Sequence, residues 1–157
     1  MNYYKQTESL ISNYKQLKTF IEIKKKEIEE IDYFAVPGIS LEYTGGPSGT
    51  GSTTENAAIR IHDRKKSLEK QIDKTTRKVE RIEMAMGTLD QTGHEIITAR
   101  YIERKEWWQI AYKVHCGERW AKELRRRAIL TMAVALYGED AMQQSTNTAH
   151  LKENPVL

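Results

Sequence analysis

Basic side chains gather between residues 119 and 127, where they alternate with apolar residues at helical spacing. Ala121, Leu124 and Ala128 recur at steps of three and four, so they share one face of a helix and leave the charged side chains on the other faces. The first outward groups are Arg119, Lys122 and Glu123. Arginine and lysine donate to guanine O6 and N7, and a glutamate accepts from the cytosine amine. This helix is therefore predicted to contact DNA base edges.

Further groups are suited to the DNA backbone, because arginine, lysine and amide donors hold phosphates whatever the base sequence. They are Arg125, Arg126 and Arg127 on the same helix, Arg104 and Lys105 ahead of the preceding segment, and Gln109 within it. Arg126 also faces outward, so it is a candidate for base contact as well as for phosphate contact. Trp120, next to Ala121, is expected either beside the DNA or half buried against neighbouring helices.

Residues 106 to 117 have the features of a shorter helix and a sharp turn that would position the basic helix. Two helices that cross steeply need a small residue where their backbones meet, and Ala111 supplies it. The inward apolar groups are Ile110, Val114 and Cys116, and Trp107 is a better core candidate than Trp108. The left-handed position of such turns usually carries glycine; here it is His115, so the turn forms there or is reshaped around Gly117. The pattern predicts a helix-turn-helix.

Two heptad patterns precede this segment and predict long helices. The first consists of Tyr3, Thr7, Leu10, Tyr14, Leu17, Ile21, Lys24, Ile28 and Ile31, and the second of Ile61, Lys65, Leu68, Ile72, Thr75, Val79, Ile82, Met86 and Leu89. Each helix has one narrow apolar stripe, and an antiparallel pair buries both stripes. Polar residues within the stripes weaken that pair, so we expect a homo-oligomer that completes the seam.

The predicted fold is all-α, with a long coiled-coil-like antiparallel helical hairpin followed by a C-terminal helix-turn-helix domain. The hairpin and oligomerisation region covers 1–89, with a flexible Gly-rich loop over 33–54 and a helix start at Ser52 to Glu55. The DNA-binding domain covers 90–138 and the disordered tail 139–157. A hinge is expected at Gly87 to Gly93, followed by a helix over His94 to Glu103 that Asp90 or Thr92 caps.

Composition excludes several other classes of protein. With 157 residues, 30% of them charged, the chain can form one small core and long solvated helices. The net charge of +3 is mild, so a polyanion must be bound by a local patch. A single cysteine, no secretion signal and no membrane-spanning apolar run favour a cytoplasmic protein. Scattered histidines predict no metal site, the Gly-rich run lacks a following Gly-Lys-Ser/Thr, and no catalytic arrangement recurs; we expect neither cofactor nor enzymatic activity.

One family likeness extends these expectations. The run from Arg100 to Ala111, followed by the turn and a basic helix ending in Arg127 and Ala128, resembles region 4 of bacterial sigma factors. Together with Gly45 to Gly49 and the Glu-Asn-Ala-Ala-Ile segment from Glu55, it more closely resembles the phage-encoded RinA/ArpU-type regulators of late transcription. The resemblance covers roughly residues 10–138. It implies a protein of a bacterial host's cytoplasm that binds double-stranded DNA and activates phage packaging and morphogenesis genes with host RNA polymerase.

Two alternatives remain open at the level of sequence. A phage small terminase subunit also joins a helix-turn-helix to an oligomerising hairpin, and it would recognise DNA for packaging. A purely structural coiled-coil protein would not need the register of Ala111, Ala121 and Leu124. The residue pattern fits activation and repression of transcription equally.

Overall fold

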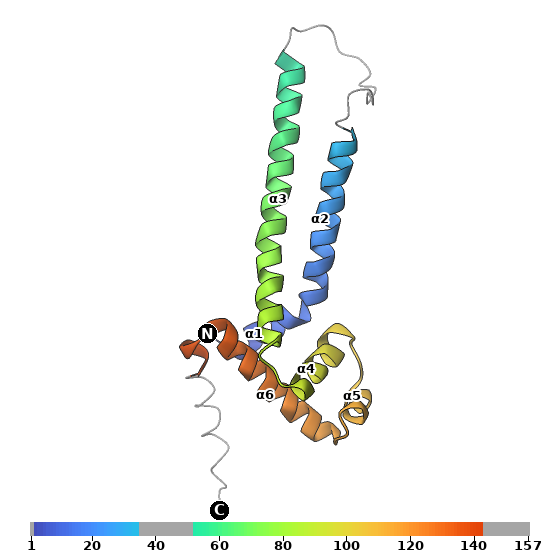
Figure 1. Cartoon of the computed structure of the whole chain (residues 1–157), viewed down its shortest axis with the longest axis vertical. Coiled ribbons are helices and arrows are strands. Elements are labelled where there is room, and N and C mark those ends of the chain that lie inside the picture. The colour runs from blue at the N-terminus through green and yellow to red at the C-terminus, as the bar shows by residue number, and fades with distance from the viewer. Residues whose placement is uncertain (1, 35–51, 143–157) are drawn as a thin grey trace, which may run out of the picture. The chain divides into compact units, whose positions relative to one another are not determined.

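The structure, a computed structural model, describes residues 2–34 and 52–142, and within these ranges it is α-helical without strands. The predicted all-α class is therefore confirmed for the described residues. The elements in chain order (Figure 1) are α1 (Tyr3–Ser12), α2 (Tyr14–Phe34), α3 (Ser52–Met86), α4 (Gln91–Ile97), the π-helix η1 (Thr98–Ile102), α5 (Trp107–Lys113) and α6 (Glu118–Tyr137).

The predicted loop and tail fall mainly on residues 35–51 and 143–157, outside the described residues. The predicted helix start at Ser52 is confirmed, whereas helix α2 continues to Phe34, one residue beyond the predicted start of the loop at residue 33. Residues 139–142 form a further helical turn, in which Ala141 is only 3% exposed. A buried side chain anchors this turn, so the ordered part of the chain extends beyond residue 138.

The chain divides into two compact units, one of residues 1–15 and 78–157 and the other of residues 16–77. This division differs from the predicted boundary at residue 89. Helix α1 packs on α6 and η1, and the ring of Tyr3 lies 4.9 Å from that of Tyr137. At the end of α3, Val79, Ile82 and Met86 are buried. Helix α1 and the end of α3, the first and last parts of the predicted hairpin, thus belong to the same unit as the C-terminal helices. Heptad spacing predicts that these faces are buried but not which helix covers them.

The expected single helix from Tyr3 to Ile31 is interrupted at Asn13. The Asn13 backbone N–H and side-chain amide both donate to the carbonyl of Ser9, at 3.1 and 2.9 Å. A short amide side chain that competes for backbone acceptors disfavours helix continuation. The heptad pattern misses this break because it records only apolar spacing.

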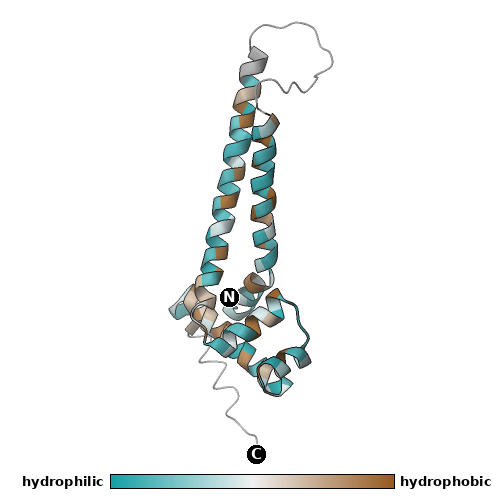
Figure 2. Cartoon of the chain, turned by 45° about the vertical axis from the view of Figure 1, so that its right-hand side comes forward, coloured by the Kyte–Doolittle hydropathy of each residue, from teal (hydrophilic) through white to brown (hydrophobic). Residues whose placement is uncertain are grey.

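In the unit of residues 16–77, α2 and α3 run side by side in opposite directions (Figures 1 and 2). Hydrophilic residues cover most of both helices in Figure 2. Among the described side chains of this unit, only Ile21 and Leu68 are buried, whereas the predicted seam residue Ile61 is 43% exposed.

Ion pairs join the two helices of this unit. The Lys65 ammonium lies 2.8 Å from the Asp32 carboxylate, and its pKa is raised mainly by that hydrogen bond. Glu27 pairs with Lys24 and with Arg64, and hydrogen bonds from these two cations lower its pKa. Charge pairs therefore supplement a thin apolar seam.

The start of α4 is built around Asp90 and Gly93. Asp90 Oδ1 accepts from the Gly93 backbone N–H at 2.9 Å, so Asp90 is the cap and Thr92 is not. A Cβ at Gly93 would lie 2.6 Å from that oxygen and 3.5 Å from Ala128 Cβ. Glycine thus permits both the cap and the close approach of α6. The helix predicted over His94 to Glu103 begins earlier, at Gln91, and becomes the π-helix η1 at Thr98.

Candidate nucleic-acid interface

Helices α5 and α6 are held together by a small apolar core. Ile110, Ala111 and Ala121 are 0%, 6% and 0% exposed and pack with the buried Ile96 and Ala99. The partly buried residues around this core are Trp107, Val114, Cys116 and Leu124. The apolar positions expected to face inward are therefore brought together, with Ala111 and Ala121 as the small residues of the contact.

The turn between α5 and α6 forms at His115. This residue has φ of 53°, in the left-handed region, and the following Cys116 N–H donates to the Ala111 carbonyl at 3.0 Å. Gly117 has an extended backbone, with φ of −74°, and caps α6. Reshaping of the turn around Gly117 is thus excluded, and the histidine adopts a conformation that costs less in glycine.

The exposed face of α6 begins with Arg119, Trp120 and Lys122, all solvent-exposed. Trp120 is 49% exposed, so about half of its surface is open to solvent, and its predicted position beside DNA stays a prediction. The Arg127 guanidinium lies 5.0 Å from the Trp120 ring, close enough for a cation–π interaction. An indole and three basic groups are therefore available on the first three turns of this helix.

Glu123 is less available to a base than the spacing predicts. Its carboxylate lies 3.5 Å from Arg126 Nη1 and 3.7 Å from Arg127 Nε, and its side chain is 34% exposed. Both arginines contact Oε1, so they offset the charge of Glu123, and a cytosine amine would have to reach the other oxygen, Oε2. The side chain of Arg126 is itself only 27% exposed, whereas that of Arg127 is 61% exposed. Of this cluster, Arg127 is the group best placed to meet a phosphate.

Arg125, predicted to hold phosphate, instead connects α6 to α1. Its Nη1 lies 3.3 Å from Glu8 Oε1 and 3.4 Å from the Tyr101 hydroxyl, and its side chain is 28% exposed. The Tyr101 hydroxyl in turn donates to the same Glu8 oxygen at 2.6 Å. Burial, and then the hydrogen bond to Glu8, raise the pKa of Tyr101 far above its usual value. The guanidinium of Arg125 therefore already contacts a carboxylate of α1, and its predicted contact with a phosphate stays a prediction.

Cations surround the ring of Trp107. The Arg100 guanidinium lies 5.0 Å from the ring centroid, and the Lys122 ammonium and Arg125 guanidinium each lie 5.6 Å away. Arg100 also donates to the Lys105 carbonyl at 3.0 Å. Trp107 therefore packs against the apolar core on one side and contacts Lys122 of the exposed face of α6 on the other. Sequence reasoning did not single out Glu8, Arg100 and Tyr101 as site residues. Glu8 lies 117 residues from Arg125, so no spacing signal connects them, and Arg100 and Tyr101 lie on the π-helix η1, which the apolar pattern does not predict.

Arg104, Lys105 and Gln109, predicted to bind phosphate, differ in exposure and in their contacts within the protein. Lys105 pairs with Glu103 at 2.6 Å, and this hydrogen bond lowers the pKa of Glu103. Arg104 is exposed and has a φ of 56°. Gln109 is exposed, but its Oε1 accepts from the Glu106 backbone N–H at 3.1 Å and so stabilises the start of α5. Only its amide nitrogen remains for a phosphate.

The described residues contain neither a metal-ligating cluster nor a membrane-spanning helix. No group of three or more His, Cys, Asp or Glu side chains converges there as a metal site. Among the helices of residues 2–34 and 52–142, none combines the length and apolar character needed to cross a bilayer.

Comparison with known proteins gives one match. The model of the family described as "Protein of unknown function (DUF722)" matches residues 3–133, from the first residue of α1 to the last turns of α6. No curated protein and no solved structure matches the chain. The matched region includes the exposed face of α6, but the family description names no activity.

Proposed function

The chain belongs to the DUF722 family, and we propose that it is a sequence-specific DNA-binding protein in which α5 and α6 act as a helix-turn-helix. The observation that carries this proposal is the two-sided character of α6. Its inner face packs on α5 through Ala121, whereas Arg119, Lys122 and Arg127 are exposed on its outer faces. A positively charged helix held by a second short helix is the arrangement that enters the DNA major groove.

The exposed groups divide into two roles. Arg119 and Lys122 lie in the first turns of α6, the part of a recognition helix that reaches base edges, so they read sequence. Arg127, stacked near Trp120, binds the backbone, with help from Arg104, Lys105 and the amide of Gln109. Arg126 and Glu123 form an ion pair on the surface of α6. Arg125 contacts Glu8 and so fixes α6 against α1.

The proposed cellular role is activation of phage late genes together with host RNA polymerase. It rests on the resemblance of the helix-turn-helix segment to sigma region 4 and to RinA/ArpU-type regulators. We further propose that the antiparallel pair formed by α2 and α3 assembles the protein as a homo-oligomer, which presents several copies of α6 to repeated half-sites.

Selection from a pool of randomised DNA duplexes, followed by footprinting of the enriched site, tests DNA recognition. Removing a base-reading group costs about 1–3 kcal/mol, so Arg119→Ala and Lys122→Ala are each expected to weaken binding to the selected site by about tenfold to a hundredfold. Arg77→Ala is the matched control, because among the residues that the structure describes this exposed arginine pairs only with Asp73 on the same helix. Protection that persists unchanged in both α6 variants would refute the proposed contacts.

Mass in solution separates the regulator from the packaging alternative. A small oligomer agrees with transcription regulation, whereas a large closed ring would favour a small terminase subunit.

A further inference from the structure

The outer face of α2 carries an exposed stripe that α3 does not cover. Ile23, Lys26, Glu30 and Tyr33 follow one another at steps of three and four, so they lie on one face of the helix. This face is opposite to that of the buried Ile21. Ile23 and Tyr33 are 56% and 64% exposed, so both side chains are available to a partner on this face.

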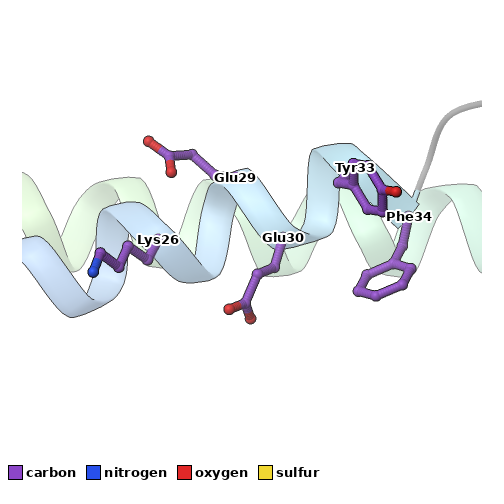
Figure 3. Close-up of a pocket in the computed structure, with 5 residues that line it drawn as sticks. All are labelled: Lys26, Glu29, Glu30, Tyr33 and Phe34. Carbon is purple, nitrogen blue, oxygen red and sulfur yellow. The ribbon is translucent and has the colours of Figure 1, made fainter.

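Figure 3 shows how the side chains of this face are arranged. Lys26, Glu30 and Phe34 point to one side of α2, Glu29 and Tyr33 point to the other, and α3 lies behind. A shallow hollow lies between these rows, lined by the same five residues. The Phe34 ring, 52% exposed, meets the Tyr33 ring edge-on at a centroid distance of 5.6 Å. The aromatic end of α2 therefore flanks a concave, partly charged surface.

The charges of this stripe differ from their neighbours in having no partner. Lys24, Lys25, Glu22 and Glu27 form ion pairs around α2. Within residues 2–34 and 52–142, by contrast, neither Lys26 nor Glu30 forms an ion pair or hydrogen bond. Lys26 and Glu30 lie four residues apart on one exposed face. Both can form ion pairs at once with a surface that places an acid opposite Lys26 and a base opposite Glu30.

We propose that this stripe binds the same stripe of a second copy of the chain, with the two α2 helices antiparallel. In that arrangement Lys26 of each copy faces Glu30 of the other, and Ile23 of each faces Tyr33 of the other. Residues 26 and 30, and residues 23 and 33, are each equally far from Ile28 along the helix. A single two-fold axis that passes beside Ile28 therefore forms both pairs in both copies. A parallel pair in register would instead set Lys26 against Lys26 and Glu30 against Glu30.

The same spacing fits the layers of an antiparallel coiled coil, in which the two core positions of the heptad meet across the interface. The overlap of the described helices about this axis runs only from residue 22 to residue 34. An interface of this length falls below the ~1,200 Å² of total buried area typical of stable complexes. A weak dimer, with a dissociation constant in the micromolar range or above, is the expected result.

Charge exchange on the full chain, measured by sedimentation equilibrium without DNA, tests the proposal. Lys26→Glu places two acids opposite each other at both symmetric positions, and Glu30→Lys places two bases there. Each variant is expected to weaken dimerisation by about tenfold. The double variant restores the opposite pairs and the wild-type association, and an equimolar mixture of the two single variants forms heterodimers.

Lys25→Glu is the matched control, since it reverses a charge on the same helix but off the stripe, and it should leave dimerisation unchanged. Helix content measured by circular dichroism checks that every variant is folded. Monomeric wild-type protein, equal association of all variants, or failure of the double variant to recover would each overturn the proposal. The result does not depend on DNA binding, because binding to an isolated half-site is measured separately and can fail or succeed on its own.

Discussion

The placement of Arg125 makes a prediction that separates structural from DNA-binding arginines on the same helix. Arg125→Met keeps an unbranched side chain over Trp107 but removes the contacts to Glu8 at 3.3 Å and to the Tyr101 hydroxyl at 3.4 Å. Arg119→Met, at an exposed position of α6, is the matched control. The first change is expected to destabilise the fold, and the second to weaken DNA binding.

The magnitude follows from what each substitution removes. A hydrogen bond to a charged group contributes about 1.5–3 kcal/mol and a cation–π contact about 0.5–1 kcal/mol. Arg125 Nε is buried without a hydrogen-bond partner, so its removal offsets part of this loss. The free energy of unfolding should therefore fall by about 1–2 kcal/mol, whereas an exposed surface substitution such as Arg119→Met changes it by at most ~0.5 kcal/mol.

Urea unfolding of both variants, followed by circular dichroism, measures the difference. At concentrations where the protein is folded, Arg125→Met should bind DNA with nearly wild-type affinity. Combining it with Glu8→Gln gives a thermodynamic cycle, in which a coupling of about 0.5 kcal/mol or more reports the direct contact. Wild-type stability together with a loss of DNA affinity equal to that of Arg119→Met would refute the internal role of Arg125.

Three further predictions concern the turn, the cap and the buried hydroxyl. His115→Gly should raise the free energy of unfolding by about 0.5–1 kcal/mol, because it relieves the backbone at φ of 53°, and thermal unfolding would show no gain if the turn were unstrained. Asp90→Ala should cost about 1 kcal/mol in the wild type but much less in a Gly93→Ala background, where the added Cβ has already displaced the capping oxygen; equal losses in both backgrounds would contradict this. The raised pKa of Tyr101 means that the folded state keeps its phenol proton when the unfolded chain loses it above roughly pH 10. Stability from this group is therefore present below that pH and falls above it, so the stability advantage of wild type over Tyr101→Phe should shrink in alkaline urea titrations, and a constant difference would exclude the linkage.

Local spacing was sufficient to predict much of the C-terminal helices. The steps of three and four that join Ala121, Leu124 and Ala128 correctly predicted an inward face, and the small Ala111 correctly marked its counterpart on α5. Asp90 was one of two predicted caps because its side chain and spacing suit a helix start. Each of these features depends on residues within a few turns of one another.

Features that depend on distant residues could not be predicted in this way. The contact between Arg125 and Glu8 joins positions 117 residues apart, and no periodicity links them. The same reason explains why the compact units are divided differently from the predicted boundary at residue 89, since a heptad shows that a face is apolar but not which helix covers it. The break at Asn13 is local, but it depends on a side-chain hydrogen bond that heptad spacing does not record. The left-handed turn at His115 was one of the two alternatives that the sequence left open, and the backbone there confirms it.

The salt dependence of DNA binding by α6 variants tests the proposed function most directly. Fluorescence anisotropy on the selected duplex, measured across a range of salt concentrations, distinguishes phosphate contacts from base contacts. Arg127→Ala should reduce the slope of log affinity against log salt by about 1 and weaken binding to all sequences alike. Arg119→Ala should mainly reduce the preference for the selected site over random DNA. Wild-type protein that shows no preference between these duplexes, or an affinity that does not change with salt, would contradict sequence-specific DNA binding through α6.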